Sequence, residues 1–237
     1  MRKVLFIALS VLLVIFVTSC ALFEKPPLLK TITVDGDLSD WGDYIYTDPS
    51  DDSKPSGNEI YKAGIIFDEK NLYIAGEIKT EVEDTVLGPI PKFLPTILVD
   101  LSGTNGASAL KDENGKETLK IENGNIDLVF LFGFLSVYKE GEFVLLTDNG
   151  QIDGKPLYKI ESKTTDDGKT RFEISVPLDK IGVTDPNTLK ARAVVILVGG
   201  EQEPIIPDYA PNQGFEKADG KYTLPITIKK MIENPKK

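Results

Sequence analysis

Three carboxylates, Asp48, Asp51 and Asp52, stand within five consecutive residues. Like charges at this spacing repel one another unless a cation lies between them. Carboxylate oxygens, together with backbone carbonyls of the proline- and glycine-containing residues that follow, suit Ca²⁺. The segment is therefore either a structural calcium site or a solvated acidic loop without metal. Asp35 and Asp40 would add ligands if this loop folds back on the turn that precedes it.

The residues that are missing narrow the chemistry further. The 237-residue chain has no histidine, and its one cysteine is Cys20. This composition excludes Ser-His-Asp and Cys-His catalysis, and most zinc, copper and non-haem iron sites, which use imidazole or thiolate ligands. Carboxylate pairs could serve glycoside hydrolysis, but among 37 acidic residues such pairs arise by chance. No nucleotide-binding loop, nucleophile elbow or metal-hydrolase motif is present, so the sequence favours a non-catalytic protein.

The charge balance limits the partners. The formal net charge is −10, which argues against nucleic acid because phosphates would repel the surface. The same repulsion argues against binding anionic lipid through the protein surface.

Tyrosines are the aromatic candidates for ligand binding. Tyr44 and Tyr46 lie beside the acidic loop at a spacing of two, on one face if that stretch is a strand. Tyr209, Asn212 and Gln213 lie in a proline-rich segment, 201–215, that reads as a long loop, and loops often carry binding residues. Exposed tyrosine rings would form a stacking platform, whereas buried rings would belong to the core.

The elements that must position these residues are nearly all β-strands. Apolar alternation and turn residues predict about eleven strands, at 31–34, 59–67, 72–80, 96–101, 118–122, 126–138, 142–146, 157–164, 170–176, 189–198 and 222–228. Hairpin turns are predicted around 68–71, 123–125 and 166–169. Val176–Gly182 predicts at most one short helical turn, with Pro177 near its start and Gly182 at its end. The pattern indicates one all-β domain, an antiparallel sandwich of the jelly-roll or immunoglobulin-like kind.

The N-terminus has the pattern of a targeting segment. Arg2 and Lys3 precede fourteen mostly apolar residues, 4–17, a run too short to cross a bilayer as a helix. Residues 17–20, Val-Thr-Ser-Cys, resemble the bacterial lipobox. The resemblance implies that residues 1–19 are a signal peptide and that Cys20 is acylated and becomes the N-terminus. Loss of two cations with the signal would change the net charge from −10 to −12.

The mature chain is then divided into a lipidated N-terminus and tether (20–30), a β-sandwich domain (31–230) and a polar tail (231–237). Several acyl chains, as this class of lipoprotein carries, would give stable attachment. The expected location is the cell envelope, outside the cytoplasm and at a membrane.

Three motifs in order resemble carbohydrate-binding modules of family 9. They are residues 32–41 (ITVDGDLSDW), 68–78 (DEKNLYIAGEI) and 171–182 (RFEISVPLDKIG). The resemblance spans most of the predicted domain and implies a β-sandwich with a sugar-binding function. The chain departs from the family at the ligand, because sugar-binding members use two exposed tryptophans and this chain has only Trp41, inside the first motif. That tryptophan is read as a core residue, with a stacking platform as the alternative.

A second resemblance covers the acidic loop. Residues 47–58 (TDPSDDSKPSGN) are similar to a loop in C-terminal modules of glucodextranase- and pullulanase-type enzymes, with Ser50 where that pattern has glycine. Together the observations predict a lipid-anchored envelope protein whose module binds poly- or oligosaccharide without catalysis. The alternative is a structural or protein-interaction module, with an envelope protein as partner, that has lost sugar binding.

Overall fold

The computed structural model describes residues 28–49, 53, 57–85, 88–131, 133–199, 205–211, 222–223 and 226–235. Cys20, Asp51, Asp52, Asn212 and Gln213 lie outside these residues. No helix in the described part is long and apolar enough to cross a bilayer.

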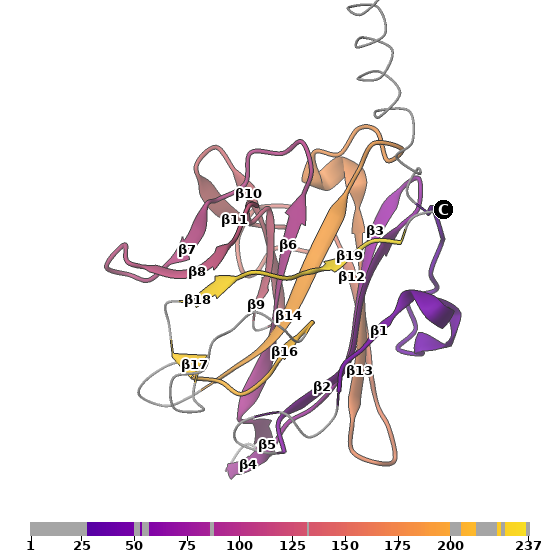
Figure 1. Ribbon diagram of the computed structural model, residues 1–237, viewed down its shortest axis with the longest axis vertical. Helices are drawn as coiled ribbons and strands as arrows, with labels where there is room; N and C mark the ends of the chain where they lie inside the picture. The colour runs from indigo at the N-terminus through magenta and orange to yellow at the C-terminus, as the bar shows by residue number, and fades with distance from the viewer. Residues whose placement is uncertain are drawn as a thin grey trace, which may run out of the picture.

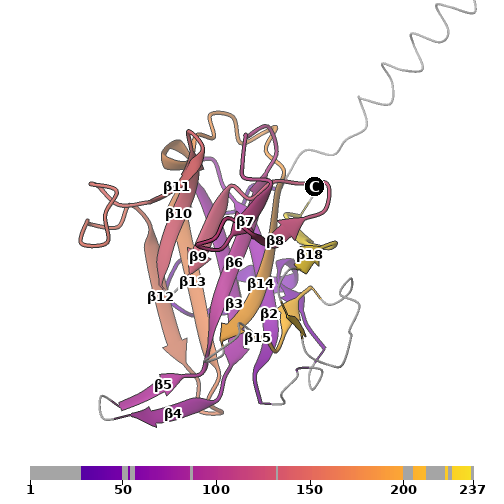
Figure 2. The ribbon, with the colours of Figure 1, turned by 90° about the vertical axis from the view of Figure 1, so that its left-hand side faces the viewer.

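Two antiparallel sheets pack face to face (Figures 1 and 2). The smaller sheet has the strand order β1-β2-β3-β13-β12, with β1 Tyr46–Thr47, β2 Glu59–Phe67, β3 Asn71–Lys79, β13 Thr170–Pro177 and β12 Lys159–Thr164. The larger sheet has the order β11-β10-β9-β6-β14-β15-β17, with β11 Glu142–Leu145, β10 Phe134–Lys139, β9 Leu128–Leu131, β6 Phe93–Leu101, β14 Ala191–Gly199, β15 Ile205–Ile206 and β17 Tyr222–Thr223. The prediction of an antiparallel all-β sandwich is confirmed.

One edge of β14 pairs with β6 along its whole length, and short strands share the other edge. Besides β15, these are β16, Tyr209–Ala210, and β19, Ile232–Glu233. A three-stranded sheet of β18 (Ile226–Ile228), β8 (Glu117–Ile121) and β7 (Ala109–Lys111) includes the parallel pair β18–β8. The hairpin of β4 (Val82–Thr85) and β5 (Gly88–Pro91) extends from one end of the sandwich (Figure 2).

Each sheet is covered on both faces at its centre. The main core lies between the sheets and includes Ile65, Ile74, Ile97 and Val195. A second apolar cluster covers the outer face of the larger sheet, and a third covers the outer face of the smaller sheet with the segment 28–45. Two-sided covering explains why β2, β3 and β14 read as nearly continuous apolar runs rather than as clean alternation.

Several predicted elements differ in the structure. Residues 31–34 form no strand, and Thr33 N–H donates to the Asp40 carboxylate rather than to a neighbouring strand. The predicted strand 126–138 is broken at Gly133, which has φ 85° and joins β9 to β10. The turn at 123–125 does not close a hairpin, since β8 pairs with β7 and β18 instead of β9. Residues 232–234 of the predicted polar tail pair with β14, and Asn234 is buried.

Two short 3-10 helices complete the described chain. The predicted turn is η2, Leu178–Ile181, which Pro177 precedes and Gly182 ends in a left-handed conformation. The other is η1, Leu38–Tyr44, which the sequence did not indicate. It follows the Asp-Gly turn at 35–36 and lies against the outer face of the smaller sheet (Figure 1).

Candidate functional site

Two hollows adjoin at Arg192 and Glu233, the two residues that line both of them. The first, of about 620 Å³, is here called the tyrosine hollow. Its lining is mainly aromatic, aliphatic and basic: Asp43, Tyr44, Ile45, Tyr46, Arg192, Pro211, Lys229, Lys230, Met231, Ile232, Glu233 and Pro235. The second, of about 720 Å³, is called the amide hollow because Asn123, Asn125, Asn187 and Asn234 lie in its wall. Each volume is in the range of small-molecule sites.

η1 and β1 bring Tyr44 and Tyr46 to the wall of the tyrosine hollow. Tyr44 is 38 % exposed and Tyr46 is half-buried. The ammonium of Lys30 lies 4.8 Å from the centre of the Tyr44 ring, a cation–π contact on that side chain. Both tyrosines line this hollow, but not as two residues on one face of a strand, because Tyr44 ends η1 and Tyr46 in β1 packs against the core between the sheets.

A buried glutamate holds η1 in place. Glu173 on β13 is fully buried and accepts three hydrogen bonds, from Trp41 Nε1 at 2.8 Å, Asp35 N at 2.9 Å and Gly36 N at 2.7 Å. Trp41 has no exposed surface, which confirms its interpretation as a core residue. Its ring lies over Gly64, where an added Cβ would come within 2.8 Å of the indole. The motif 32–41 thus serves to position Tyr44.

Tyr209 does not contribute a stacking surface. It is 5 % exposed and belongs to the apolar cluster on the outer face of the larger sheet, because β16 pairs with the centre of β14. Its predicted role as a ligand-binding aromatic is therefore wrong. Pro211, just before the predicted ligands Asn212 and Gln213, lines the tyrosine hollow.

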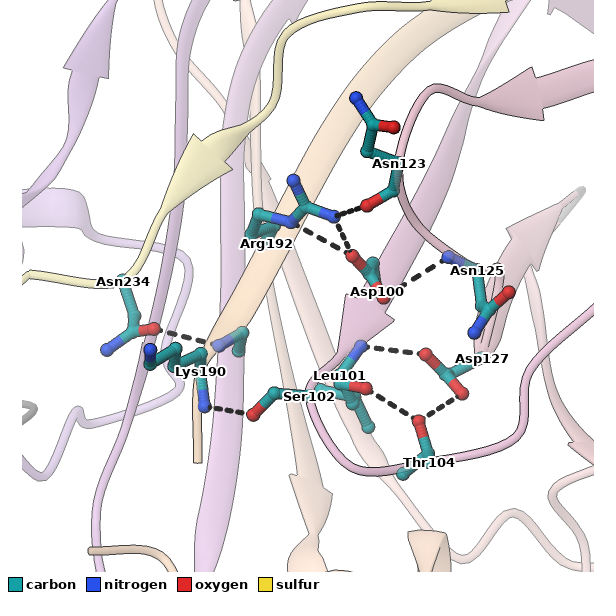
Figure 3. A network of polar contacts seen from close by, with 11 residues as sticks. Asp100, Leu101, Ser102, Thr104, Asn123, Asn125, Asp127, Lys190, Arg192 and Asn234 are labelled. Atoms are coloured by element: carbon teal, nitrogen blue, oxygen red, sulfur yellow. Dashed lines mark hydrogen bonds and ion pairs between the residues drawn. The ribbon is translucent and has the colours of Figure 1, made fainter. Parts of the chain in front are cut away.

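A row of alternating charges crosses three strands where the two hollows meet. Arg192 on β14 stands opposite Asp100 on β6 and opposite Glu233 on β19. Arg192 Nε donates to Asp100 Oδ2 at 2.9 Å, and Nη2 donates to the same oxygen and to the Asn123 carbonyl at 3.2 Å (Figure 3). Asp100 is 8 % exposed, so this pair is a largely desolvated, charge-assisted contact.

Asp127 organises the loop in the wall of the amide hollow. Its buried carboxylate accepts from Leu101 N at 2.7 Å and from Thr104 Oγ1 (Figure 3). Burial raises the pKa of Asp127, and the nearby charge of Asp100 adds to the rise, while the two hydrogen bonds oppose it. Across the hollow, Ser102 exchanges hydrogen bonds with Lys190, and Asn234 accepts from Ala191 N. The walls are therefore held by internal bonds.

The described carboxylates of the predicted calcium site do not gather. Asp48 is 3 % exposed beside β2. Asp35 accepts from Asp37 N, and Asp40 accepts from Thr33 N, as side chains do in local turns. Asp40 Oδ1 is buried with no hydrogen-bond partner. Within the described ranges no three acidic, histidine or cysteine side chains form a metal-binding group. Asp35 and Asp40 therefore do not fit a shared calcium site with Asp48.

Sequence reasoning missed Asp100, Arg192 and Glu233 as members of a site. Two of them carried a signal, because Asp100 interrupts the apolar run 96–101 and Arg192 interrupts the run 189–198. A charge in a strand that is otherwise buried on both faces requires a partner. Glu233 carried no such signal, since it lies in a polar C-terminal stretch.

No protein-family model matches this chain, and no curated protein matches it. Among solved structures, the chain is similar to a carbohydrate-binding module of family 9 from Caldicellulosiruptor kristjanssonii in complex with glucose. The identity is 15 %, the match covers 73 % of this chain and 77 % of that chain, and the TM-score is 0.40. The chain is also similar to a family 9 module from the same organism in complex with cellotriose. The identity is 14 %, the match covers 73 % of this chain and 75 % of that chain, and the TM-score is 0.38. We base the functional proposal on the residues of this chain.

Proposed function

We propose that this protein is a non-catalytic carbohydrate-binding module, displayed on the cell envelope, that binds poly- or oligosaccharide at the tyrosine hollow. The observation that carries the proposal is that Tyr44 and Tyr46 line the same hollow as the charged side chains of Arg192 and Glu233. Ligand sites of this size combine apolar rings with a few placed polar groups, which set orientation and specificity.

A sugar unit suits such a wall because it has two kinds of surface. Its C–H face can pack on a tyrosine ring, and each hydroxyl can both donate and accept a hydrogen bond. Arg192 supplies donors and Glu233 supplies an acceptor on neighbouring strands, which lie about 5 Å apart. Both kinds of contact can thus be made to a single sugar.

The envelope location follows from the proposed lipid on Cys20. The Leu28 N–H donates to the carbonyl of Pro235 at 2.9 Å, and Pro235 lines the tyrosine hollow. Seven residues lie between Cys20 and Leu28, and the eight residue steps of an extended chain span at most about 26–29 Å. An acylated Cys20 would therefore keep the hollow within reach of glycans close to a membrane.

A glycan array probed with the full-length protein in a non-glycosidic detergent tests the proposal. We expect binding to at least one polysaccharide. Tyr44→Ala should weaken that binding tenfold or more, because a stacking surface is removed, whereas Tyr44→Phe should retain it. If no glycan binds the natural chain, the proposal is wrong.

A protein-interaction module is the second candidate. It is favoured by the β4–β5 arm, on which Val82 is 57 % exposed and Ile90 is 47 % exposed. Val82 pairs with Pro91 and Ile90 pairs with Glu83, so the two side chains lie on opposite faces of the hairpin and each face displays one apolar side chain to a partner. Cross-linking in intact cells, compared between the natural chain and a Val82→Ser/Ile90→Ser variant, tests it: loss of a specific adduct in the variant supports this candidate.

A further inference from the structure

The guanidinium of Arg192 is held so that one nitrogen remains for a ligand. Nε and Nη2 are used by Asp100 and by the Asn123 carbonyl. Nη1 makes no hydrogen bond with any described residue, and Figure 3 shows it pointing away from Asp100. The Arg192 side chain is 30 % exposed. Because the other two nitrogens are anchored, Nη1 presents its two N–H donors with little rotational freedom to lose on binding.

Glu233 supplies the complementary acceptor. It is exposed, and its carboxylate makes no hydrogen bond or ion pair with the residues that the structure describes. Its strand partner Arg192 stands directly opposite, so both side chains project from the same face of the larger sheet. Ile232, the preceding residue, packs in the core between the sheets, which agrees with Glu233 facing outward.

A glycine lets the loop 122–125 approach the ion pair of Arg192 and Asp100 closely. An added Cβ at Gly124 would lie 2.5 Å from Arg192 Nη2 and 2.7 Å from Asp100 Oδ2. The loop 122–125 can approach the ion pair this closely only without a side chain at that position. The predicted turn at 123–125 therefore closes over Arg192 rather than joining two strands of a hairpin.

We infer that the donor–acceptor pair Arg192–Glu233 is the central contact of a site that spans both hollows and takes an uncharged oligosaccharide of several units. This inference rests on the proposed carbohydrate-binding function. A single sugar fills one hollow, whereas an extended chain meets Tyr44 on one side of the pair and Asn125 on the other. The charges in the row alternate from Asp100 to Arg192 to Glu233, so a chain with the same charge on every unit would meet repulsion from at least one of these side chains.

The length of the ligand is the direct test. Isothermal titration of the full-length protein in a non-glycosidic detergent would use β-1,4-linked ladders of glucose, xylose and mannose, from one to six units. We expect affinity for at least one ladder to rise tenfold or more between one and four units. For the six-unit member of that ladder, Tyr44→Ala and Asn125→Ala should each lower the affinity at least fivefold, because they remove contacts on opposite sides of Arg192.

Three variants address the pair itself. Glu233→Ala and Arg192→Lys should each lower the affinity for the six-unit oligosaccharide tenfold or more. Glu142 is an exposed glutamate that lines neither hollow, so Glu142→Ala should leave the affinity unchanged. Gly124→Ala should have the effect of Arg192→Lys without changing any charge. Urea unfolding of each variant separates a lost contact from a lost fold; Glu233→Ala, which breaks no described contact, should unfold as the natural chain does.

The outcomes are separable. Equal affinity for one and six units, or an effect of Tyr44→Ala without any effect of Asn125→Ala, overturns the spanning site and leaves the proposed function standing. No binding to any ladder or to the glycan array removes the proposed function and the spanning site together.

Discussion

Replacing Glu173 with glutamine should loosen the segment that carries Tyr44. Glu173 accepts from the Trp41 indole and from the backbone of Asp35 and Gly36, and it has no exposed surface. In Glu173→Gln one side-chain oxygen becomes an NH₂ group. If the remaining oxygen keeps the two backbone donors, the new NH₂ faces the indole N–H, and two donors meet without an acceptor.

The size of the effect follows from these three bonds. Hydrogen bonds to a charged group contribute about 1.5–3 kcal/mol each and neutral ones about 0.5–1.5 kcal/mol, so neutralising the two retained bonds costs about 2 kcal/mol. A buried donor left without a partner costs about 1–3 kcal/mol more. Removing a buried charge lowers the desolvation cost and offsets part of this loss. We expect a net loss of about 2–3 kcal/mol in the free energy of unfolding.

The assay is provided by the sequence, since Trp41 is the only tryptophan. Its fully buried ring should emit at short wavelength in the natural chain and shift to the red when the segment 35–44 detaches. Urea unfolding followed by this emission and by circular dichroism measures the loss. Trp41→Phe is the matched control, because it removes the same indole bond without changing Glu173. This variant and the double variant lack the tryptophan, so circular dichroism alone measures their unfolding, and the double variant gives the coupling between the two residues.

A free energy of unfolding within about 0.5 kcal/mol of that of the natural chain, together with unchanged emission, would refute the anchoring role of Glu173. Loss of stability with unchanged glycan binding would separate that role from the placement of Tyr44. We expect both stability and binding to fall.

Three further predictions concern pH and metal. Burial and the hydrogen bond to Asp68 raise the pKa of Tyr73 to about 12. This contribution to stability is complete below pH 10, the pKa of an unfolded tyrosine, and is lost as pH rises toward 12. The stability of the natural chain relative to Tyr73→Phe should therefore fall between pH 10 and pH 12, and a difference in the free energy of unfolding that stays constant over this range would contradict the prediction. Protonated Asp127 stabilises the fold below pH 3.8, the ordinary pKa of this group, and this contribution is lost as pH rises through its raised pKa. The stability of the natural chain relative to Asp127→Asn should therefore fall as pH rises above 4, and a difference in the free energy of unfolding that does not change with pH would contradict this. If Asp48, Asp51 and Asp52 bind Ca²⁺ as the sequence predicts, a chelator should lower the melting temperature and added Ca²⁺ should restore it, whereas an unchanged temperature would contradict the predicted calcium site.

Local sequence pattern was sufficient for most strands and for the sandwich. The hairpin of β2 and β3 and the turn η2 were predictable because their signals, apolar runs bounded by Asp-Glu-Lys-Asn and by Pro177 and Gly182, act over a few residues. Residues 31–34 were misread because Ile32 and Val34 have the apolar spacing of a strand but pack in the outer cluster without strand partners. An apolar pattern shows that a residue is buried and leaves open which surface buries it.

Only some residues of the candidate site could be predicted from the sequence. The sequence pointed to Tyr44 and Tyr46 because they are near one another in the chain, and it misplaced Tyr209 because proline-rich spacing hid a strand that pairs with β14. Asp100, Arg192 and Glu233 are more than forty residues apart in sequence, so no local pattern could join them.

By itself, the sequence determined the class of fold and the kinds of catalysis and metal binding that its composition excludes. Those conclusions depend on composition and on spacing along the chain, and the absence of histidine holds in any conformation. Only the tertiary structure decided which carboxylates are anchors and which face a ligand, because burial and strand register, not residue type, distinguish Glu173 from Glu233. The candidate site lies where three strands distant in sequence bring Arg192 between Asp100 and Glu233.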